Sequence, residues 1–148
     1  MMRLTEAVLA GAADEQIEGV EVVERAALVA TADDVLAADG VLLGTPANFG
    51  YMSGALKPFF DSTFLAVGGA LGDDGSAGRG GGGSVLPFGL YVHGGYDTTG
   101  AVRSVTSITG ALPWRQAGPT LAVLGDVTDE DTGAAYELGG TVSALLMD

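Results

Sequence analysis

The residues best suited to hold a ligand fall in two short segments, each placed after an apolar strand. Residues 44–54 carry Phe49 and Tyr51 among glycines, and residues 93–97 combine one histidine and one tyrosine with two glycines. The run before the first segment, Gly40–Leu43, is apolar without alternation, which is typical of a strand buried on both faces of a parallel sheet. Open α/β sheets bind ligands where parallel strands end. The two segments therefore predict one ligand site.

Apolar spacing predicts the elements that must position these segments. Residues 56–64 repeat apolar side chains at helical spacing, and residues 86–92 alternate as in a strand. Elsewhere the pattern predicts helices over 4–11, 31–38, 102–112 and 128–146, and strands over 20–23, at a sheet edge, and 120–126, buried. Strands that alternate with helices predict an α/β fold, an open parallel sheet with helices on both faces. We expect one domain over residues 1–148.

Local signals refine two of these helices. Thr31 followed by Asp34 is similar to a capping box with Asp in place of Glu, and residues 128–131 are typical of the start of the last helix. Gly139 and Gly140 lie within that helix and are expected to weaken or kink it, at roughly 1 kcal/mol each relative to alanine.

Composition excludes several kinds of chemistry. The chain has no cysteine and one histidine, which excludes disulfides and thiol catalysis and leaves too few ligands for a nitrogen- or sulfur-bound metal, so we expect no metal site. The formal net charge of −13 repels nucleic acid and anionic lipid, so neither is an expected partner. With no apolar run long enough for a membrane span and no secretory signal, the predicted compartment is the cytoplasm.

Residues 68–84 are rich in glycine, and two interpretations are open. The composition favours a flexible insertion. A phosphate-binding loop is the alternative, but the Gly-Lys-Ser/Thr ending of such a loop is missing and no helix follows.

The segment GTPANFGYMSGALKPFFDST, Gly44–Thr63, resembles the signature of flavodoxin-like FMN proteins. It is most similar to the NAD(P)H-dependent FMN reductases and the quinone oxidoreductases of the tryptophan-repressor-binding-protein type. The resemblance implies that FMN lies between this loop and the loop after the next strand, and that NAD(P)H is a co-substrate. The residues that it assigns to the flavin are Thr45, Pro46, Asn48, Phe49, Gly50, Tyr51, Met52, His93, Gly94, Gly95, Tyr96 and Asp97. A flat, amphipathic ring needs such aromatic walls and main-chain donors.

One part of the family pattern has no counterpart. Family members begin with a buried strand and a Ser/Thr-Gly-rich loop that holds the FMN phosphate at a helix N-terminus. Met1 to Glu6 aligns with the body of that helix, so the first strand and the phosphate loop are missing. We expect that the sequence is truncated at an internal methionine; the alternative is a variant without the usual cofactor anchor.

Several side chains have both a structural and a functional interpretation. Phe49 and Tyr51 are either flavin walls or loop residues packed over the sheet, and stacking by Tyr96 is equally open. His93 is either structural or a donor to flavin or substrate. Asp97 is interpreted as a helix N-cap rather than a catalytic carboxylate. No catalytic side chain is assigned, because the cofactor would carry the chemistry.

Three functions are compatible with these residues and this resemblance. The first is an FMN-dependent oxidoreductase that passes electrons from NAD(P)H to a quinone or similar small acceptor. The second is a flavodoxin-type electron carrier, which an acidic surface suits for docking to basic redox partners. The third is a non-catalytic flavodoxin-like remnant that binds a protein partner without flavin. Relatives of the first kind are often homodimers or homotetramers.

Overall fold

The computed structural model describes residues 1–68, 70–71, 77–78 and 85–147. Five helices lie within them: α1 Met2–Ala12, α2 Ala32–Leu36, α3 Leu56–Thr63, α4 Thr99–Thr109 and α5 Asp129–Ala144. The strands are β1 Val41–Asn48, β2 Tyr51–Met52, β3 Ala70–Leu71, β4 Ala77–Gly78, β5 Leu86–Gly94, β6 Trp114–Gln116 and β7 Leu121–Leu124. Most of the predicted flexible insertion at 68–84 lies outside the described residues.

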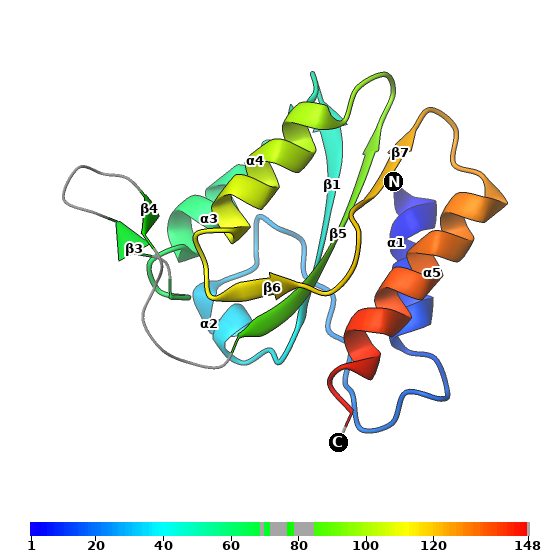
Figure 1. Ribbon diagram of the computed structural model, residues 1–148, viewed down its shortest axis with the longest axis horizontal. Helices are drawn as coiled ribbons and strands as arrows, with labels where there is room; N and C mark the ends of the chain where they lie inside the picture. The colour runs from blue at the N-terminus through cyan, green and yellow to red at the C-terminus, as the bar shows by residue number, and fades with distance from the viewer. Residues whose placement is uncertain (69, 72–76, 79–84, 148) are drawn as a thin grey trace.

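The main sheet has the order β2-β1-β5-β6, with β7 also paired to β5 (Figure 1). β1 and β5 run parallel in a continuous register from the pair Val41 and Phe88 to the pair Ala47 and Gly94. β6 and β7 are both parallel to β5, at its beginning and its end respectively. β2 is the exception, since it folds back antiparallel on the last two residues of β1. The predicted α/β class with a mainly parallel open sheet is confirmed.

Helices cover both faces of the sheet, α3 and α4 on one and α1 and α5 on the other (Figure 1). The larger core lies beneath α3 and α4 and includes Phe60, Leu90 and Val105. The smaller core lies beneath α1 and α5 and includes Leu4 and Tyr91. Because both faces are covered, Phe88–Val92 is buried without interruption, where the sequence predicted an alternating strand.

The local signals in the sequence correspond to real helix starts. Thr31 and Asp34 form a complete capping box on α2, and Thr128 and Asp131 form another on α5. α3 covers the predicted apolar stripe, with Pro58 in its first turn, where a proline is tolerated. These features depend on neighbours within four residues, which is why sequence alone predicts them.

The structure differs from the sequence-based expectations at four further places. Residues 20–23 form no strand, because no strand lies beside them to hydrogen-bond with. Trp114–Gln116 is a strand that the sequence did not predict, and Trp114 packs on Phe88 with ring centroids 5.8 Å apart. β7 is not a buried strand, since it lies at the edge of the sheet and Leu124 is exposed. α5 also runs unbroken through Gly139 and Gly140.

Those glycines allow two helices to approach closely. A Cβ atom on Gly139 would lie 2.0 Å from the carbonyl oxygen of Val8, and one on Gly11 would lie 1.9 Å from that of Tyr136. Only glycine, which has no Cβ atom, fits at both places, so the backbones of α1 and α5 lie in direct contact. Within the described ranges, no helix combines the length and the apolar character needed to cross a membrane.

Candidate functional site

The sheet register brings the two predicted ligand segments together. Pro46 of β1 pairs with His93 of β5, and both strands end at the same edge of the sheet. Beyond the strand ends the segments are in close contact, since a Cβ atom on Gly50 would lie 3.3 Å from the Oδ2 atom of Asp97. The start of α4 is as close, because a Cβ on Gly100 would lie 2.4 Å from the Gly50 carbonyl oxygen. Both segments and the start of α4 therefore form one continuous site.

The tip of the first segment is a two-residue hairpin loop between β1 and β2. Phe49 and Gly50 connect the paired residues Asn48 and Tyr51, and both have positive φ, 51° and 75°. Positive φ at both positions is the type I′ hairpin geometry, which favours Asn-Gly. For a bulky residue such as Phe49 this conformation costs about 1–3 kcal/mol.

Phe49 is also 97% exposed, so its ring gains nothing from burial that could offset the backbone cost. Two further aromatic side chains of the site are open to solvent, Tyr51 at 45% and Tyr96 at 76%. Three accessible aromatic rings on two neighbouring loops are a surface suited to stack against a flat ligand.

Two of the predicted ligand residues hold the loop from inside. The Thr45 hydroxyl is fully buried; it donates to the Pro46 carbonyl oxygen at 2.8 Å and accepts from the Ser53 backbone N–H at 2.9 Å. The Met52 side chain lies in the larger core, 2% exposed. These contacts fix both ends of the hairpin, so the side chains of Thr45 and Met52 do not face a ligand, whereas that of Asn48 is exposed.

His93 connects three elements at the sheet edge. Its Nδ1 atom accepts from the Met1 amino nitrogen at 3.0 Å, and its Nε2–H donates to the Gly125 carbonyl oxygen at 2.6 Å. The Gly125 N–H in turn donates to the Gly94 carbonyl oxygen at 2.8 Å. With both ring nitrogens occupied, His93 positions the start of α1 and the loop after β7, as the structural interpretation of this residue predicted.

Asp97 acts at the start of α4. Its carboxylate accepts from the Thr99 backbone N–H at 2.9 Å. Hydrogen bonds from the backbone and side chain of Thr99 and from the backbone of Thr98 lower the pKa of Asp97. The N-cap of α4 is Thr98, so Asp97 lies one residue before the position that the sequence predicted for it. Its neighbour Gly95 is exposed, and a Cβ atom there would have no other atom within 4 Å, so its main chain is accessible to a ligand.

Sequence reasoning did not single out Gly100 or Gly125. Gly100 allows the hairpin loop to lie against α4, and Gly125, with φ of 74°, brings a third loop to His93. A glycine in the first turn of a helix and a glycine directly after a strand were the signals available in the sequence.

The site has features that suit the flat ring of an aromatic cofactor. Phe49, Tyr51 and Tyr96 supply aromatic surface, and Gly95 supplies accessible main chain. At the start of α1, by contrast, no side chain caps the helix, and Arg3 is engaged by the Val127 carbonyl oxygen and by Asp129.

The fold is flavodoxin-like. A flavodoxin from the domain Archaea superposes with a TM-score of 0.74 at 14% identity, covering 98% of this chain and 89% of that one. A WrbA-like flavodoxin from Agrobacterium tumefaciens gives 0.65 at 17% identity, over 99% and 90% of the two chains. At these identities the likeness establishes the fold.

Part of the chain is also similar in sequence to named quinone oxidoreductases. Over 72 residues the chain is 42% identical to an NAD(P)H dehydrogenase (quinone) from Syntrophobacter fumaroxidans, covering 48% of this chain and 32% of that protein. Over 81 residues it is 36% identical to the quinone-oxidoreductase QR2 of Triphysaria versicolor, covering 55% and 36%. The matched part is thus about a third of these relatives' length. No protein-family model matches the chain. The resemblance read from Gly44–Thr63 is confirmed.

Proposed function

We propose that this protein is an FMN-dependent oxidoreductase that passes electrons from NAD(P)H to a quinone or a similar small acceptor. The observation that carries the proposal is the strained, fully exposed Phe49 beside Tyr51 and Tyr96, where two parallel strands end. A protein keeps an unfavourable backbone conformation and exposed aromatic rings together where both serve a ligand.

The described residues would divide the binding of the flavin between them. Phe49, Tyr51 and Tyr96 would stack on the ring and exclude water from it, and the accessible main chain of Gly95 would provide polar contacts. Thr45 and His93 act indirectly, since their hydrogen bonds fix the two loops. When bound, FMN supplies the hydride and electron chemistry, so no side chain need act as an acid or a base.

The named relatives support the same activity. Both are quinone oxidoreductases by name, and a structural neighbour with a TM-score of 0.62 at 15% identity is an NADH:FMN oxidoreductase. For this chain the activity, the quinone acceptor and the nicotinamide are proposals, as are a homodimeric or homotetrameric state and the cytoplasmic location.

The direct test is FMN titration followed by flavin fluorescence, with Phe49→Gly as the variant. Glycine removes the ring and relieves the positive φ, so we expect about tenfold weaker FMN binding, equivalent to about 1.4 kcal/mol, with stability unchanged or higher. Leu65→Ala is the control, because Leu65 is 64% exposed and lies outside the site. Equal affinities for Phe49→Gly and the unmodified chain would contradict the proposed ring contact.

An electron carrier is the second candidate, favoured by the formal net charge of −13. An acidic surface speeds docking to basic redox partners. The FMN-loaded protein distinguishes the two: an oxidoreductase consumes NADH or NADPH with a quinone present, whereas a carrier does not and exchanges electrons only with another redox protein. A chain that takes up no FMN would contradict both of these functions and leave the non-catalytic form as the remaining candidate.

A further inference from the structure

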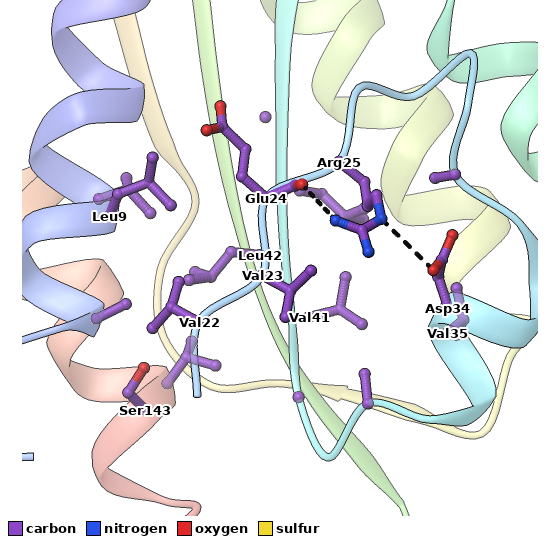
Figure 2. Close-up of a pocket in the computed structure, with 18 of the residues that line it drawn as sticks. Leu9, Val22, Val23, Glu24, Arg25, Asp34, Val35, Val41, Leu42 and Ser143 are labelled. Atoms are coloured by element: carbon purple, nitrogen blue, oxygen red, sulfur yellow. Dashed lines mark hydrogen bonds and ion pairs between the residues drawn. The ribbon is translucent and has the colours of Figure 1, made fainter. Parts of the chain in front are cut away.

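Positive charges are rare in this chain, so the position of each one is informative. The sequence has six lysine and arginine residues against 19 aspartate and glutamate residues. Arg3 and Arg25 are each held by a backbone carbonyl oxygen and by a carboxylate, and Figure 2 shows both contacts of Arg25. The other cations of the described residues are Lys57, Arg103 and Arg115.

Lys57 lies in the first turn of α3, which is tied by hydrogen bonds to the hairpin of β1 and β2. The Thr45 hydroxyl accepts from the Ser53 N–H at 2.9 Å. Ser53 in turn accepts from the Leu56 N–H, at 3.1 Å through its carbonyl oxygen and at 3.2 Å through its hydroxyl. The Lys57 N–H also reaches the Ser53 carbonyl oxygen, at 3.5 Å. The position of Lys57 relative to the hairpin is therefore fixed.

The ion pair that Lys57 makes is a weak one. Its Nζ donates to the Asp61 Oδ1 atom at 2.5 Å; this bond is the largest cause that raises the pKa of Lys57, and the nearby Tyr51 adds to the rise electrostatically. The two charged side chains are 41% and 62% exposed, and exposed pairs of this kind contribute little to stability. The pair also opposes the helix dipole, because the lysine lies in the first turn and the aspartate in the last. The charge of Lys57 is thus available to an anion beside Tyr51.

Arg103 brings a second cation to the same hairpin from α4, which covers the same face of the sheet as α3 (Figure 1). It lies three residues after Gly100, so the two residues share one side of the helix. Gly100 is where α4 meets the hairpin, since a Cβ atom there would lie 2.4 Å from the Gly50 carbonyl oxygen. Arg103 is exposed, and its guanidinium forms no ion pair among the described residues. The hairpin therefore has a cation on each flanking helix.

The overall charge of the protein gives these two cations their significance. A formal net charge of −13 repels anions. A nicotinamide dinucleotide is an anion, through its pyrophosphate and, in the phosphorylated form, through an additional 2′-phosphate. Arginine and lysine are the side chains that bind phosphate groups in proteins. A nicotinamide dinucleotide therefore needs local positive charge at the place where its phosphates would lie.

We propose that Lys57 and Arg103 bind the phosphate groups of the nicotinamide dinucleotide, on the side of the hairpin that faces α3 and α4. The proposal rests on the proposed function, because it takes NAD(P)H as the reductant. On binding, Lys57 exchanges the Asp61 carboxylate for a phosphate oxygen, and the planar guanidinium of Arg103 donates two N–H groups to phosphate oxygens. These cations suit either the pyrophosphate, which NADH and NADPH share, or the 2′-phosphate, which only NADPH has.

The test is isothermal titration calorimetry of the FMN-loaded protein with NADP⁺, NAD⁺ and inorganic pyrophosphate. The variants are Lys57→Gln, Arg103→Gln and the conservative Lys57→Arg. Arg115→Gln is the matched control, because it removes the same charge from an exposed position on β6, which pairs with the start of β5, whereas the site lies at the end of β5. Inorganic pyrophosphate is also titrated into each chain without FMN, and the Tm of each variant is measured.

We expect Lys57→Gln and Arg103→Gln each to weaken binding about tenfold, Lys57→Arg to restore most of the affinity, and Arg115→Gln to change it by less than about twofold. Weaker binding of all three ligands would assign the cations to the pyrophosphate, and weaker binding of NADP⁺ alone would assign them to the 2′-phosphate. An equal loss in Arg115→Gln would overturn the proposal, because net charge alone would then explain the effect. Unchanged affinities in Lys57→Gln and Arg103→Gln would also overturn it.

Asp61→Asn tests the exchange of partners by Lys57. Because it releases the lysine from its ion pair, we expect equal or tighter binding of the same ligand, and weaker binding would refute the exchange. Failure of this proposal and failure of the proposed function have different signatures. A chain that takes up no FMN contradicts the proposed function, whereas pyrophosphate titration of the FMN-free chain still reports on Lys57 and Arg103. An FMN-loaded chain that binds neither the dinucleotides nor pyrophosphate overturns the phosphate site alone.

Discussion

The two edges of β1 differ in how many of their residues pair with a neighbouring strand. On the β5 edge, parallel pairing continues from Val41 to Ala47 and is backed by buried residues such as Leu90. On the opposite edge, Val41–Pro46 faces a cavity of about 820 Å³, and the valine-bearing segment beyond it is unpaired. The unalternating sequence of β1 is that of a central strand, which needs a neighbour on each side. β1 therefore separates a fully paired part of the sheet from a part that borders a cavity.

Leu90→Ala is expected to have the largest effect, because it breaks the completed side. Leu90 is fully buried in β5, and large-to-small substitutions in a core cost about 2–5 kcal/mol. Urea denaturation measures the loss. The matched control is Leu36→Ala, since Leu36 is 62% exposed and its truncation should change stability by no more than about 0.5 kcal/mol.

Gly139→Ala tests the close packing of α5 against α1. The new methyl group would meet the Val8 carbonyl oxygen at 2.0 Å, and overpacking against backbone costs about 1–3 kcal/mol. Gly133 has no atom within 4 Å of its Cβ position, so Gly133→Ala in the same helix should stabilise by up to about 1 kcal/mol. If thermal melts show equal stability for the two variants, the close contact of α1 with α5 is refuted.

The capping boxes of α2 and α5 can be compared through the same substitution, threonine to alanine. Thr128→Ala should cost about 1 kcal/mol in a chemical denaturation experiment, because it removes the hydroxyl that accepts from the Asp131 N–H at 3.2 Å. Thr31→Ala should cost less, because α2 has only five residues and borders the cavity. A larger loss of stability for Thr31→Ala would mean that α2 contributes more to the free energy of unfolding than its short length indicates.

The acid sensitivity of these caps has a definite sign. Backbone hydrogen bonds from Thr128 and Thr31 are the largest cause that lowers the pKa of Asp131 and of Asp34 respectively. A carboxylate with a folded-state pKa below its unfolded value stabilises the fold above the unfolded pKa, near 3.9, and this contribution disappears as pH falls through the folded value. Asp131→Asn should therefore destabilise at pH 7 and have little effect at the acid limit, which urea denaturation at a series of pH values would measure.

Val22→Ser should have the smallest effect. Val22 is half-buried in an unpaired segment, so replacing it should change the unfolding free energy by about 0.5 kcal/mol or less. Urea denaturation measures the change, and a loss above about 1 kcal/mol would show that Val22 makes stabilising contacts that its exposure does not indicate.

Features that depend on near neighbours could be predicted from the sequence. The capping residues Thr31 and Thr128 are recognisable because their partners stand three positions away. The site loops were also predictable as a pair, since apolar strands place residues 44–54 and 93–97 at one sheet edge.

Features that depend on distant contacts could not be predicted. Whether Val20–Val23 forms a strand depends on a neighbouring strand to pair with, and the local sequence pattern does not show whether one is present. Gly139 was expected to weaken α5, but its meaning is set by the backbone of α1, at the other end of the chain. The positive φ of Phe49 likewise follows from the pairing of β1 with β2, which no residue in the loop specifies.

The outer boundary of the sheet is divided between two short strands, with β6 pairing at the start of β5 and β7 at its end. Between them the Ala117 N–H still donates to the Phe88 carbonyl oxygen, and the Gln116 side chain donates to the Thr120 hydroxyl. A boundary interrupted in this way offers a foreign chain no long straight row of peptide groups. This edge of the sheet is therefore a poor template for strand pairing between molecules.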